Sequence, residues 1–345
     1  MAEIETGLLE GAIAPAENTK LFGHEAAEAF LAQSYRRGKS HHAILIEGPE
    51  GIGKATLAFR FANHVLVHPV PEEAPVDLAD PDPQSFSYRQ IVAGASHNLL
   101  HLSRPVDAKT GKRKSAITVD EVRRAGKFFS QTTGSDSWRI VIVDPADDLN
   151  RNAANAILKM LEEPPRRSLF LVLSHAPGKL LPTIRSRCQP LLLRALGPEP
   201  MQQAVSALGL ALPAGREDDV LAKAGGSVAQ ALRLINYGGL DMIEAFEQMV
   251  SASGPAQRRA MHKLADAAAH KDNETLYRFF VDHAEQVIAG AARKAALAQD
   301  SARAFRLATL SSKVSEQVST ADAFNLDRKQ TVLALLGEIA ENGVS

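Results

Sequence analysis

A loop suited to phosphate binding lies near the start of the chain. In GPEGIGKAT, residues 48–56, glycines and a lysine follow the spacing G-x-x-x-x-G-K-[ST]. Such a loop surrounds phosphate oxygens with backbone N–H groups, its lysine offsets their charge, and the hydroxyl after the lysine binds Mg²⁺. That position is Ala55 here, and Thr56 is rotated about 100° further around the helix, so it does not substitute. The spacing predicts a nucleotide-contacting set without the metal ligand: Gly48, Gly51, Gly53, Lys54, Ala55 and Thr56.

A second chemical group comes directly after the apolar run RIVIV, residues 139–143. Asp144 stands where P-loop ATPases carry the carboxylate that associates with the metal. The next residue, where such enzymes usually have a glutamate that orients the attacking water, is Pro145, which has no side-chain base. We expect Asp147 and Asp148 to be capping or solvated acids at the start of the next helix. The chain therefore lacks both the hydroxyl that binds the metal and the glutamate that acts as the base in ATP hydrolysis.

Short apolar runs and helical patterns alternate through the first half of the chain and must position these residues. The runs predict buried parallel strands, and they cover 43–47, 98–102, 139–143, 169–173 and 190–193. Between them, apolar residues spaced for one helix face occur around 27–35, 57–65, 122–129 and 149–161. This alternation predicts an α/β domain with a mainly parallel sheet.

No strand pattern appears after about residue 195, and the rest of the chain has helical patterns. One small helical unit surrounds residues 225–226, and a second covers 239–342. In the last helix, Asp327 and Gln330 suit a capping box and Gly343 suits the end. Four apolar residues of that helix share one face, namely Val332, Leu335, Leu336 and Ile339.

Composition limits the classes of protein to which the chain can belong. Its 345 residues suggest two or three domains, and a hydrophobic fraction of 45% is enough for packed cores. A net charge of −1 gives no overall attraction to nucleic acid or to an acidic membrane. The single cysteine, Cys188, excludes internal disulfides and a cysteine-rich zinc cluster. With no signal-peptide pattern and no apolar run of about 18 residues, we expect a cytoplasmic protein without a membrane segment.

Several blocks of the sequence resemble one family. GPEGIGKATLA, RIVIVDPADDLNRNAANAILKMLEEPP, LFLVLSHAPGKLLPTIRSRC and AGGSVAQALRLI are similar to AAA+ clamp-loader subunits, and more narrowly to the delta-prime family of bacterial DNA polymerase III. NLDRKQ near the end is similar too, and the resemblance weakens in 68–90 and 240–320. It implies a P-loop AAA+ domain over 1–195, a small helical lid over 196–238 and an all-α collar for oligomerisation over 239–345.

The resemblance also implies a function and partners. The family loads a ring-shaped sliding clamp onto primed DNA in a five-subunit assembly, in which motor subunits hydrolyse ATP and delta-prime is their more rigid neighbour. It therefore implies a non-hydrolysing subunit that assembles with gamma/tau and delta, and that meets the clamp and the DNA through the complex. No intrinsic ATPase is expected, although the holoenzyme is a DNA-directed DNA polymerase, a nucleotidyltransferase. We expect no required cofactor, and at most weak ATP or ADP binding without hydrolysis.

Two departures from the family pattern bear on this interpretation. Motor subunits place an arginine after Gly-Ser-x in the lid, where this chain has Ala229, and we expect Arg233, one turn later, to be an exposed helix residue. Many relatives carry a four-cysteine zinc module where this chain has the proline-rich insert 68–88, which we expect to be an exposed loop. We expect no zinc, and we expect His64 and His68 to be surface histidines.

The turn TIRSRC, residues 183–188, supplies a candidate for catalysis in a neighbouring subunit. The resemblance identifies Arg187 as the family's arginine finger, which stabilises charge on the γ-phosphate during transfer. The alternative is an arginine that pairs with a local acid, and Cys188 is expected to fill core space. Ser174 matches the polar residue that senses the γ-phosphate in this family. The alternative interpretation is that its hydroxyl, at the end of a strand, only bonds the backbone. The densest basic cluster consists of Lys109, Lys112, Arg113 and Lys114. It suits either contact with a DNA backbone or an exposed, solvated loop.

Two other functions compete with a non-hydrolysing subunit. A gamma/tau-like ATPase motor would have Ser or Thr at position 55 and Glu at position 145, and this chain has neither. A small-molecule P-loop kinase would leave the lid, the collar pattern and the Ser-Arg-Cys turn without explanation. ATPase activity of the purified chain, alone and with its partners, separates the first two functions.

Overall fold

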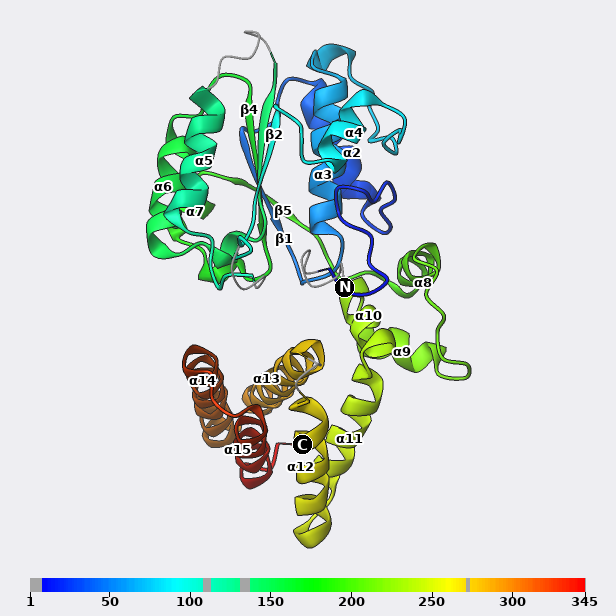
Figure 1. Ribbon diagram of the computed structural model, residues 1–345, viewed down its shortest axis with the longest axis vertical. Helices are drawn as coiled ribbons and strands as arrows, with labels where there is room; N and C mark the ends of the chain where they lie inside the picture. Colours follow the sequence, from blue (N-terminus) through cyan, green and yellow to red (C-terminus); the bar gives the residue numbers. More distant parts are fainter. Residues whose placement is uncertain (1–7, 108–112, 131–136, 271–273, 345) are drawn as a thin grey trace. The chain divides into compact units, whose positions relative to one another are not determined.

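The computed structural model describes residues 8–107, 113–130, 137–270 and 274–344. By internal contacts the chain divides into two compact units, one of residues 1–211 and 221–231 and one of residues 212–220 and 232–345. The first unit is α/β, and the described part of the second consists of helices and loops (Figure 1). This division passes through the region of the expected lid and does not test the three-domain boundaries, which stay predictions.

A parallel sheet forms the centre of the first unit. Its strands are β1 (Ala43–Glu47), β2 (Leu99–Leu102), β3 (Arg139–Val143), β4 (Ser168–Ser174) and β5 (Gln189–Leu192). They lie in the order β2-β3-β4-β1-β5, and every neighbouring pair is parallel. All seven residues of β4 are buried, because helices cover both faces of the sheet. The five predicted strands and the mainly parallel sheet are confirmed.

Helices cover the sheet on both sides, as Figure 1 shows. One side carries α2 (Glu25–Arg36), α3 (Lys54–Val67) and α4 (Phe86–Val92), and the other carries α5 (Val119–Ser130), α6 (Arg151–Glu162) and α7 (Pro182–Arg185). Alternate residues of β1 pack in opposite directions, so that Ile44 joins the core under α3 and Leu45 joins the core under α6. The core therefore has two layers, and the loops at the strand ends are left to carry chemistry.

Two predicted helix faces need small corrections. In α5 the buried aromatic residue is Phe128, while Phe129 is only partly buried against the same core. The helix α6 begins after Asn150, whose side chain accepts a hydrogen bond from the Ala153 N–H, so Leu149 lies before the helix rather than on its face.

The proline-rich insert is anchored to the first unit, which corrects the expectation of an exposed loop. It includes a short 3₁₀ helix, η1 (Pro71–Glu73), and the start of α4, and its residues Ala74 and Leu78 are buried. The buried guanidinium of Arg60 on α3 holds it in place. Arg60 Nη1 lies 2.8 Å from Asp80 Oδ1 in the insert, and Arg60 Nε lies 2.9 Å from Glu28 Oε1 on α2.

The remaining helices follow the sheet in sequence. They are α8 (Pro198–Ala207), α9 (Glu217–Ala224), α10 (Val228–Asn236), α11 (Gly239–Ser251), α12 (Gly254–Ala268), α13 (Glu274–Leu297), α14 (Ser301–Phe324) and α15 (Arg328–Glu341). In the second unit α13 packs mainly on α14, and α12 packs on α11 and α15. No helix in the described ranges is both long and apolar enough to cross a membrane.

The last helix confirms its sequence prediction. Asp327 accepts a hydrogen bond from the Gln330 N–H at 2.8 Å, and Gly343 adopts a left-handed φ of 56° after the helix ends. The predicted apolar face is buried in the core of its own unit and consists of Val332, Leu335, Leu336 and Ile339. These four side chains are therefore not available to a partner subunit.

Candidate functional site

The phosphate loop joins the end of β1 to the start of α3, as the sequence predicts. Lys54 is only 3% exposed, and its Nζ donates to the loop's own carbonyls, to Gly48 O at 2.7 Å and to Pro49 O at 2.5 Å. Burial lowers the pKa of Lys54 to about 8, against the opposing effect of the nearby carboxylates of Asp144, Glu50 and Asp147. The lysine therefore helps to hold the loop's shape.

Glycine is required in this loop by close packing. A Cβ at Gly48 would lie 2.4 Å from the Leu193 carbonyl oxygen, and a Cβ at Gly51 would lie 2.4 Å from Ala229 Cβ. Gly51 and Gly53 also have left-handed φ values of 75° and 103°. The loop's glycines thus serve the fold whether or not a nucleotide binds.

The two residues after the lysine offer no metal ligand at the expected place. Ala55 is partly buried and its side chain packs against the core under α3. Thr56 is buried within α3. A side chain that lines the core cannot act as the missing hydroxyl, so these residues do not fit a Mg²⁺ site of the hydrolysing type.

The helix α10 begins directly against the phosphate loop, within the first unit. Ser227 Oγ donates to Glu50 O at 2.9 Å, and the Val228 N–H donates to Gly51 O at 2.9 Å. Ala229, at the position of the motor subunits' lid arginine, contacts the loop through its small side chain. Arg233 is half-buried, which corrects the expectation that it is exposed.

The carboxylates after β3 correct a second expectation, because neither Asp147 nor Asp148 caps the next helix. Both lie in a 3₁₀ turn, η2 (Ala146–Asp148), before α6. Asp147 accepts hydrogen bonds from Ser174 Oγ at 2.8 Å and from the His175 N–H at 2.6 Å. Asp148 pairs with Arg104 at 2.9 Å, and burial raises its pKa although Arg104 acts to lower it.

Ser174 and Asp144 therefore lie at the same edge of the sheet as the phosphate loop. Ser174 is fully buried at the end of β4, and its hydroxyl bonds a carboxylate rather than the backbone. Asp144, at the end of β3, is half-buried with its Oδ2 3.5 Å from His101 Nε2. The sequence placed both residues correctly at strand ends but gave no sign of the Ser174–Asp147 bond.

Arg187 pairs with an acid of its own chain. Its Nη2 lies 2.7 Å from Glu162 Oε1 at the end of α6, and its Nη1 donates to Thr183 O at 3.0 Å. The side chains of Arg187 and Glu162 are 35% and 48% exposed, so the pair lies at the surface. This is the local partner that the alternative interpretation required, and a surface pair of this kind is weak enough to exchange for a stronger anion.

Other predicted residues are confirmed or corrected individually. Cys188 is buried in the core, and burial raises the pKa of its thiol to about 12, so it fills space as expected. His64 is buried rather than at the surface, and burial together with His68 lowers its pKa to about 4. Within the described ranges, no three His, Cys, Asp or Glu side chains are grouped to hold a metal ion.

Part of the basic cluster lies outside the described residues, namely Lys109 and Lys112. Its other members, Arg113 and Lys114, are exposed, and Arg113 forms an antiparallel bridge with Val106. Contact with a DNA backbone and a solvated loop both stay predictions for this cluster.

One further residue supports the loop and had no sequence signal. His24, just before α2, is buried with its Nε2 2.7 Å from Ile52 O in the phosphate loop, and burial lowers its pKa. It lies 28 residues from its partner in sequence. Only the fold brings the two together.

Fold and site together define the class of protein. A parallel sheet of order β2-β3-β4-β1-β5, a phosphate loop after β1, a carboxylate after β3 and a polar residue after β4 are the parts of an AAA+ P-loop domain. The site positions a phosphate-binding loop but lacks the hydroxyl and the base that hydrolysis uses.

Comparisons with known proteins narrow this class. Residues 23–197, just over half of the chain, match the family described as "DNA polymerase III, delta subunit". The chain therefore belongs to this family, and its curated relatives place it with the delta-prime subunits.

Two relatives and one solved structure illustrate the range of similarity. DNA polymerase III subunit delta' of Pseudomonas aeruginosa is 35% identical over 61% of this chain and 61% of its own length. Subunit gamma/tau of Mycobacterium tuberculosis is 26% identical over 94% of this chain and 55% of its own length. A gamma-subunit-related protein from Thermotoga maritima has a TM-score of 0.42 at 17% identity, covering 92% of this chain and 99% of that one. The chain thus matches less than two thirds of the length of these curated relatives.

Proposed function

We propose that this chain is a non-hydrolysing subunit of a replicative clamp loader, which helps to place a sliding clamp on primed DNA. The observation that carries the proposal is the state of the phosphate-loop edge of the sheet. There Ala55 packs into the core, Pro145 replaces the base, and Ser174 is bonded to Asp147. Three parts of one reaction are replaced or engaged by the chain itself, which supports a loss of hydrolysis.

The same proposal assigns Arg187 as an arginine finger for a neighbouring ATPase subunit. Its support is its position on a surface turn, where Glu162 and Thr183 hold the guanidinium by contacts that a phosphate can replace. Arginine suits this role because its planar guanidinium donates two parallel hydrogen bonds to phosphate oxygens. The partners would be gamma/tau and delta in a five-subunit complex, reached through the collar, residues 239–345.

Nucleotide binding is a separate part of the proposal. The chain keeps the spacing of the phosphate loop and its Lys54, although Lys54 Nζ donates to the loop's own carbonyls, so at most weak ATP or ADP binding without hydrolysis is expected. No cofactor is required by this function. The absence of zinc likewise stays a prediction.

An active gamma/tau-like motor is the second candidate, because the M. tuberculosis gamma/tau match covers 94% of this chain. The two functions separate in one assay of ATP turnover. The purified chain alone should release phosphate far below ~1 per second, the low end of common enzyme rates, while its cognate gamma/tau subunit serves as the positive control. A turnover near ~1 per second by this chain alone would establish the motor instead.

A further inference from the structure

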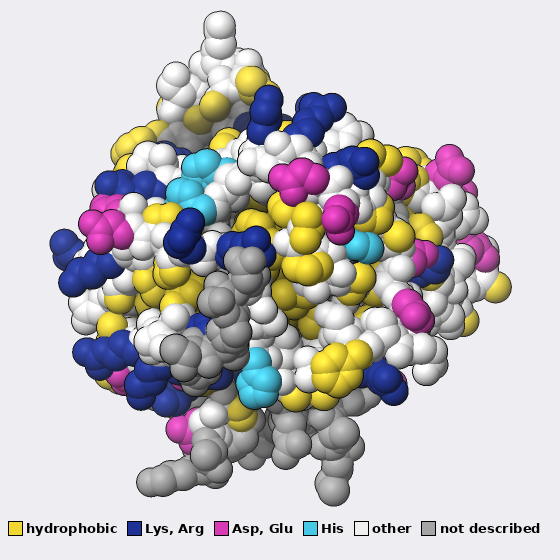
Figure 2. All heavy atoms as spheres, turned by 90° about the horizontal axis from the view of Figure 1, so that it is seen from above, with side chains coloured by type: hydrophobic (Ala, Val, Ile, Leu, Met, Phe, Trp, Pro, Cys, Tyr) yellow, Lys and Arg dark blue, Asp and Glu magenta, His cyan; other side chains and the backbone are white. Residues whose placement is uncertain are grey.

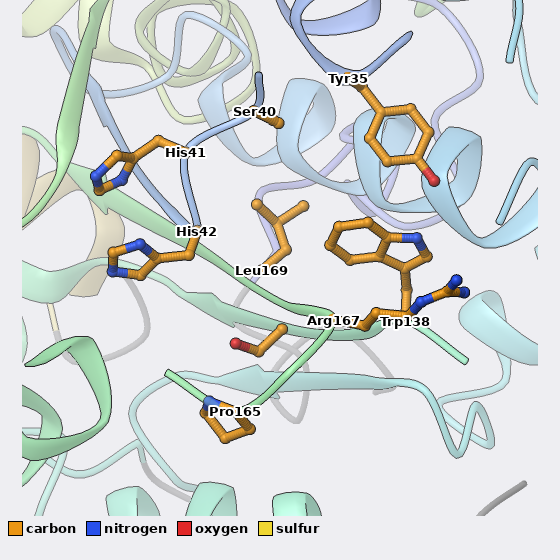
Figure 3. A pocket seen from close by; sticks show the side chains of 9 residues that line it. Tyr35, Ser40, His41, His42, Trp138, Pro165, Arg167 and Leu169 are labelled. Carbon is orange, nitrogen blue, oxygen red and sulfur yellow. The ribbon is translucent and has the colours of Figure 1, made fainter. Parts of the chain in front are cut away.

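A pocket of about 230 Å³ opens at the edge of the sheet opposite to the phosphate loop. Ser40 and His42 precede β1, Trp138 precedes β3, and Ser168 begins β4. Because parallel strands start at one edge, these residues meet around a single hollow within the first unit (Figure 3). None of them belongs to the site described above.

One wall of the pocket is apolar. Tyr35 and Trp138 lie edge to face with their ring centroids 5.5 Å apart, and Leu169 lines the floor. The polar atoms of both rings are already used by the insert, since Trp138 Nε1 donates to Pro69 O at 3.0 Å and the Tyr35 hydroxyl donates to His68 O at 2.7 Å. The rings therefore offer the pocket only carbon surface.

Two buried hydroxyls also line the pocket. Ser40 Oγ and Ser168 Oγ are shielded from solvent and have no hydrogen-bond partner in the described chain, and Ser168 is 4% exposed. Buried polar atoms nearly always have partners, so two such atoms on one small pocket point to a ligand that supplies them.

Basic residues flank the lining residues of the pocket along the chain, and Arg167 itself lines it. Arg37 and Lys39 come just before the lining residue Ser40, and Arg166 comes just before the lining residue Arg167. The side chains of Arg37, Lys39 and Arg166 are exposed. Segments 36–42 and 163–169 contain five Lys and Arg residues and one acid, Glu163, while Glu72 of the insert lies near the lining residue Tyr35. Figure 2 faces this end of the sheet and shows Lys and Arg side chains bordering exposed apolar surface. The charge around the pocket favours an acidic ligand.

We propose that this pocket binds an acidic peptide segment of a partner protein. One aliphatic side chain of the segment lies against Trp138 and Leu169, its backbone bonds the hydroxyls of Ser40 and Ser168, and its flanking carboxylates meet Arg167 and the other basic residues. The volume supports a single anchor residue, since about 230 Å³ is below the ~300–1,000 Å³ of most small-molecule sites. A buried anchor in a small pocket with a charged rim is how compact protein contacts gain specificity.

The test uses the full chain and its single tryptophan, which lines the pocket. The probe is acetyl-Glu-Asp-Leu-Asp-Glu-amide, titrated while Trp138 fluorescence is followed. We expect a saturable change with a Kd on the order of 10⁻⁴ M, as a short isolated contact gives. The same peptide with Ala in place of Leu, and one with Lys in place of every acid, should each bind at least ~10-fold more weakly.

Two variants separate recognition from folding. Arg166→Glu should weaken the probe ~10-fold or more, while Arg151→Glu, an exposed arginine at the start of α6, should leave its Kd unchanged. Ser168→Ala should weaken binding of the probe several-fold. The variant should be as stable as the wild type, because the hydroxyl that it lacks has no hydrogen-bond partner in the described chain. The proposal is overturned if the probe gives no change at ~1 mM, if both arginine variants act alike, or if only single-stranded oligothymidylate binds.

Discussion

Lys54 is a charged side chain almost completely removed from water. Burial lowers its pKa to about 8 from 10.5, and this outweighs the nearby carboxylates. Below about pH 8, Lys54 is protonated in both the folded and the unfolded chain. Because its pKa is lower in the folded chain, the buried charge then reduces the free energy of unfolding. As the pH rises from about 8 toward 10.5 the folded chain releases the proton first, and the cost is relieved.

This titration predicts an unusual pH dependence. Between pH 7 and pH 9.5 the free energy of unfolding of the wild type should rise by about 2 kcal/mol relative to Lys54→Met. Urea unfolding followed by Trp138 fluorescence measures the difference, because that tryptophan reports on the first unit. A difference that is constant across this range would show that Lys54 keeps an ordinary pKa.

At the residue scale the sequence predicted positions but not partners. Glycine and lysine spacing located the phosphate loop, and a polar residue after an apolar run located Ser174. The bond from Ser174 to Asp147, and the burial of His64, depend on which strand ends and helices the topology brings together. Spacing along the chain carries no information about contacts between distant segments, so those features had to come from the structure.

At the scale of elements, the start of α10 rests on the phosphate loop by backbone contacts. The Val228 N–H donates to Gly51 O, and Ala229 leaves no space for a side chain at position 51. These contacts need no nucleotide. They support a fixed position for the start of α10, as the proposed non-hydrolysing subunit would require.

Gly51→Ala tests this contact, with Gly94→Ala as the matched control. Both glycines have left-handed φ values, of 75° and 62°, but a Cβ at Gly94 meets nothing within 4 Å. The added clash should make Gly51→Ala more destabilising than Gly94→Ala by roughly 1–3 kcal/mol. Amide hydrogen exchange at Val228 should also accelerate in Gly51→Ala only. Equal effects of the two changes would mean that the start of α10 does not press on the loop.

The insert depends on Arg60 in a similar way. Arg60→Met leaves the carboxylates of Glu28 and Asp80 without their shared guanidinium, and should cost roughly 2–4 kcal/mol. Limited proteolysis should then cut within 68–85. The control is Arg123→Met, which removes an exposed pair with Asp120 and should stay within about 0.5 kcal/mol of the wild type. An insert that resists protease in Arg60→Met would contradict this anchoring role.

Element boundaries were predictable where the pattern was strong. Buried strands read as unbroken apolar runs, and the last helix had a cap, a single apolar face and a closing glycine. The insert was misjudged because its prolines and acids resemble an unanchored loop. Its anchor is an arginine on another element, which composition does not reveal.

At the scale of the whole molecule, the proposed collar leaves large apolar side chains exposed in the part of the chain that the structure describes. Leu297 at the end of α13 and Phe305 near the start of α14 are 80% and 74% exposed. They lie on either side of the turn between the two helices. Large exposed apolar side chains of this kind commonly mark protein contacts.

Leu297→Ser and Phe305→Ser should therefore weaken association with gamma/tau and delta without unfolding the chain. Surface changes of this type usually alter stability by no more than about 0.5 kcal/mol. Phe86→Ser, which removes a similarly exposed ring from α4, is the control and should assemble normally. Sedimentation of the mixed subunits measures the effect. Assembly of the Leu297→Ser and Phe305→Ser chains at wild-type affinity would place the interface elsewhere.

The most direct test concerns Arg187 and the acid that holds it. Cognate complexes should be assembled with Arg187→Ala, with Glu162→Ala and with Arg185→Ala, an exposed neighbour on the same turn. Each chain should fold, because a surface pair contributes only about 0–1 kcal/mol. DNA- and clamp-stimulated ATP hydrolysis is then measured at the site beside this subunit. The account predicts a loss there of about 10³–10⁵ for Arg187→Ala alone, with a smaller loss for the whole complex because other motor sites keep their own fingers. Unchanged hydrolysis in Arg187→Ala, or an equal loss in Glu162→Ala, would make Arg187 a structural partner of Glu162 and contradict the proposed function.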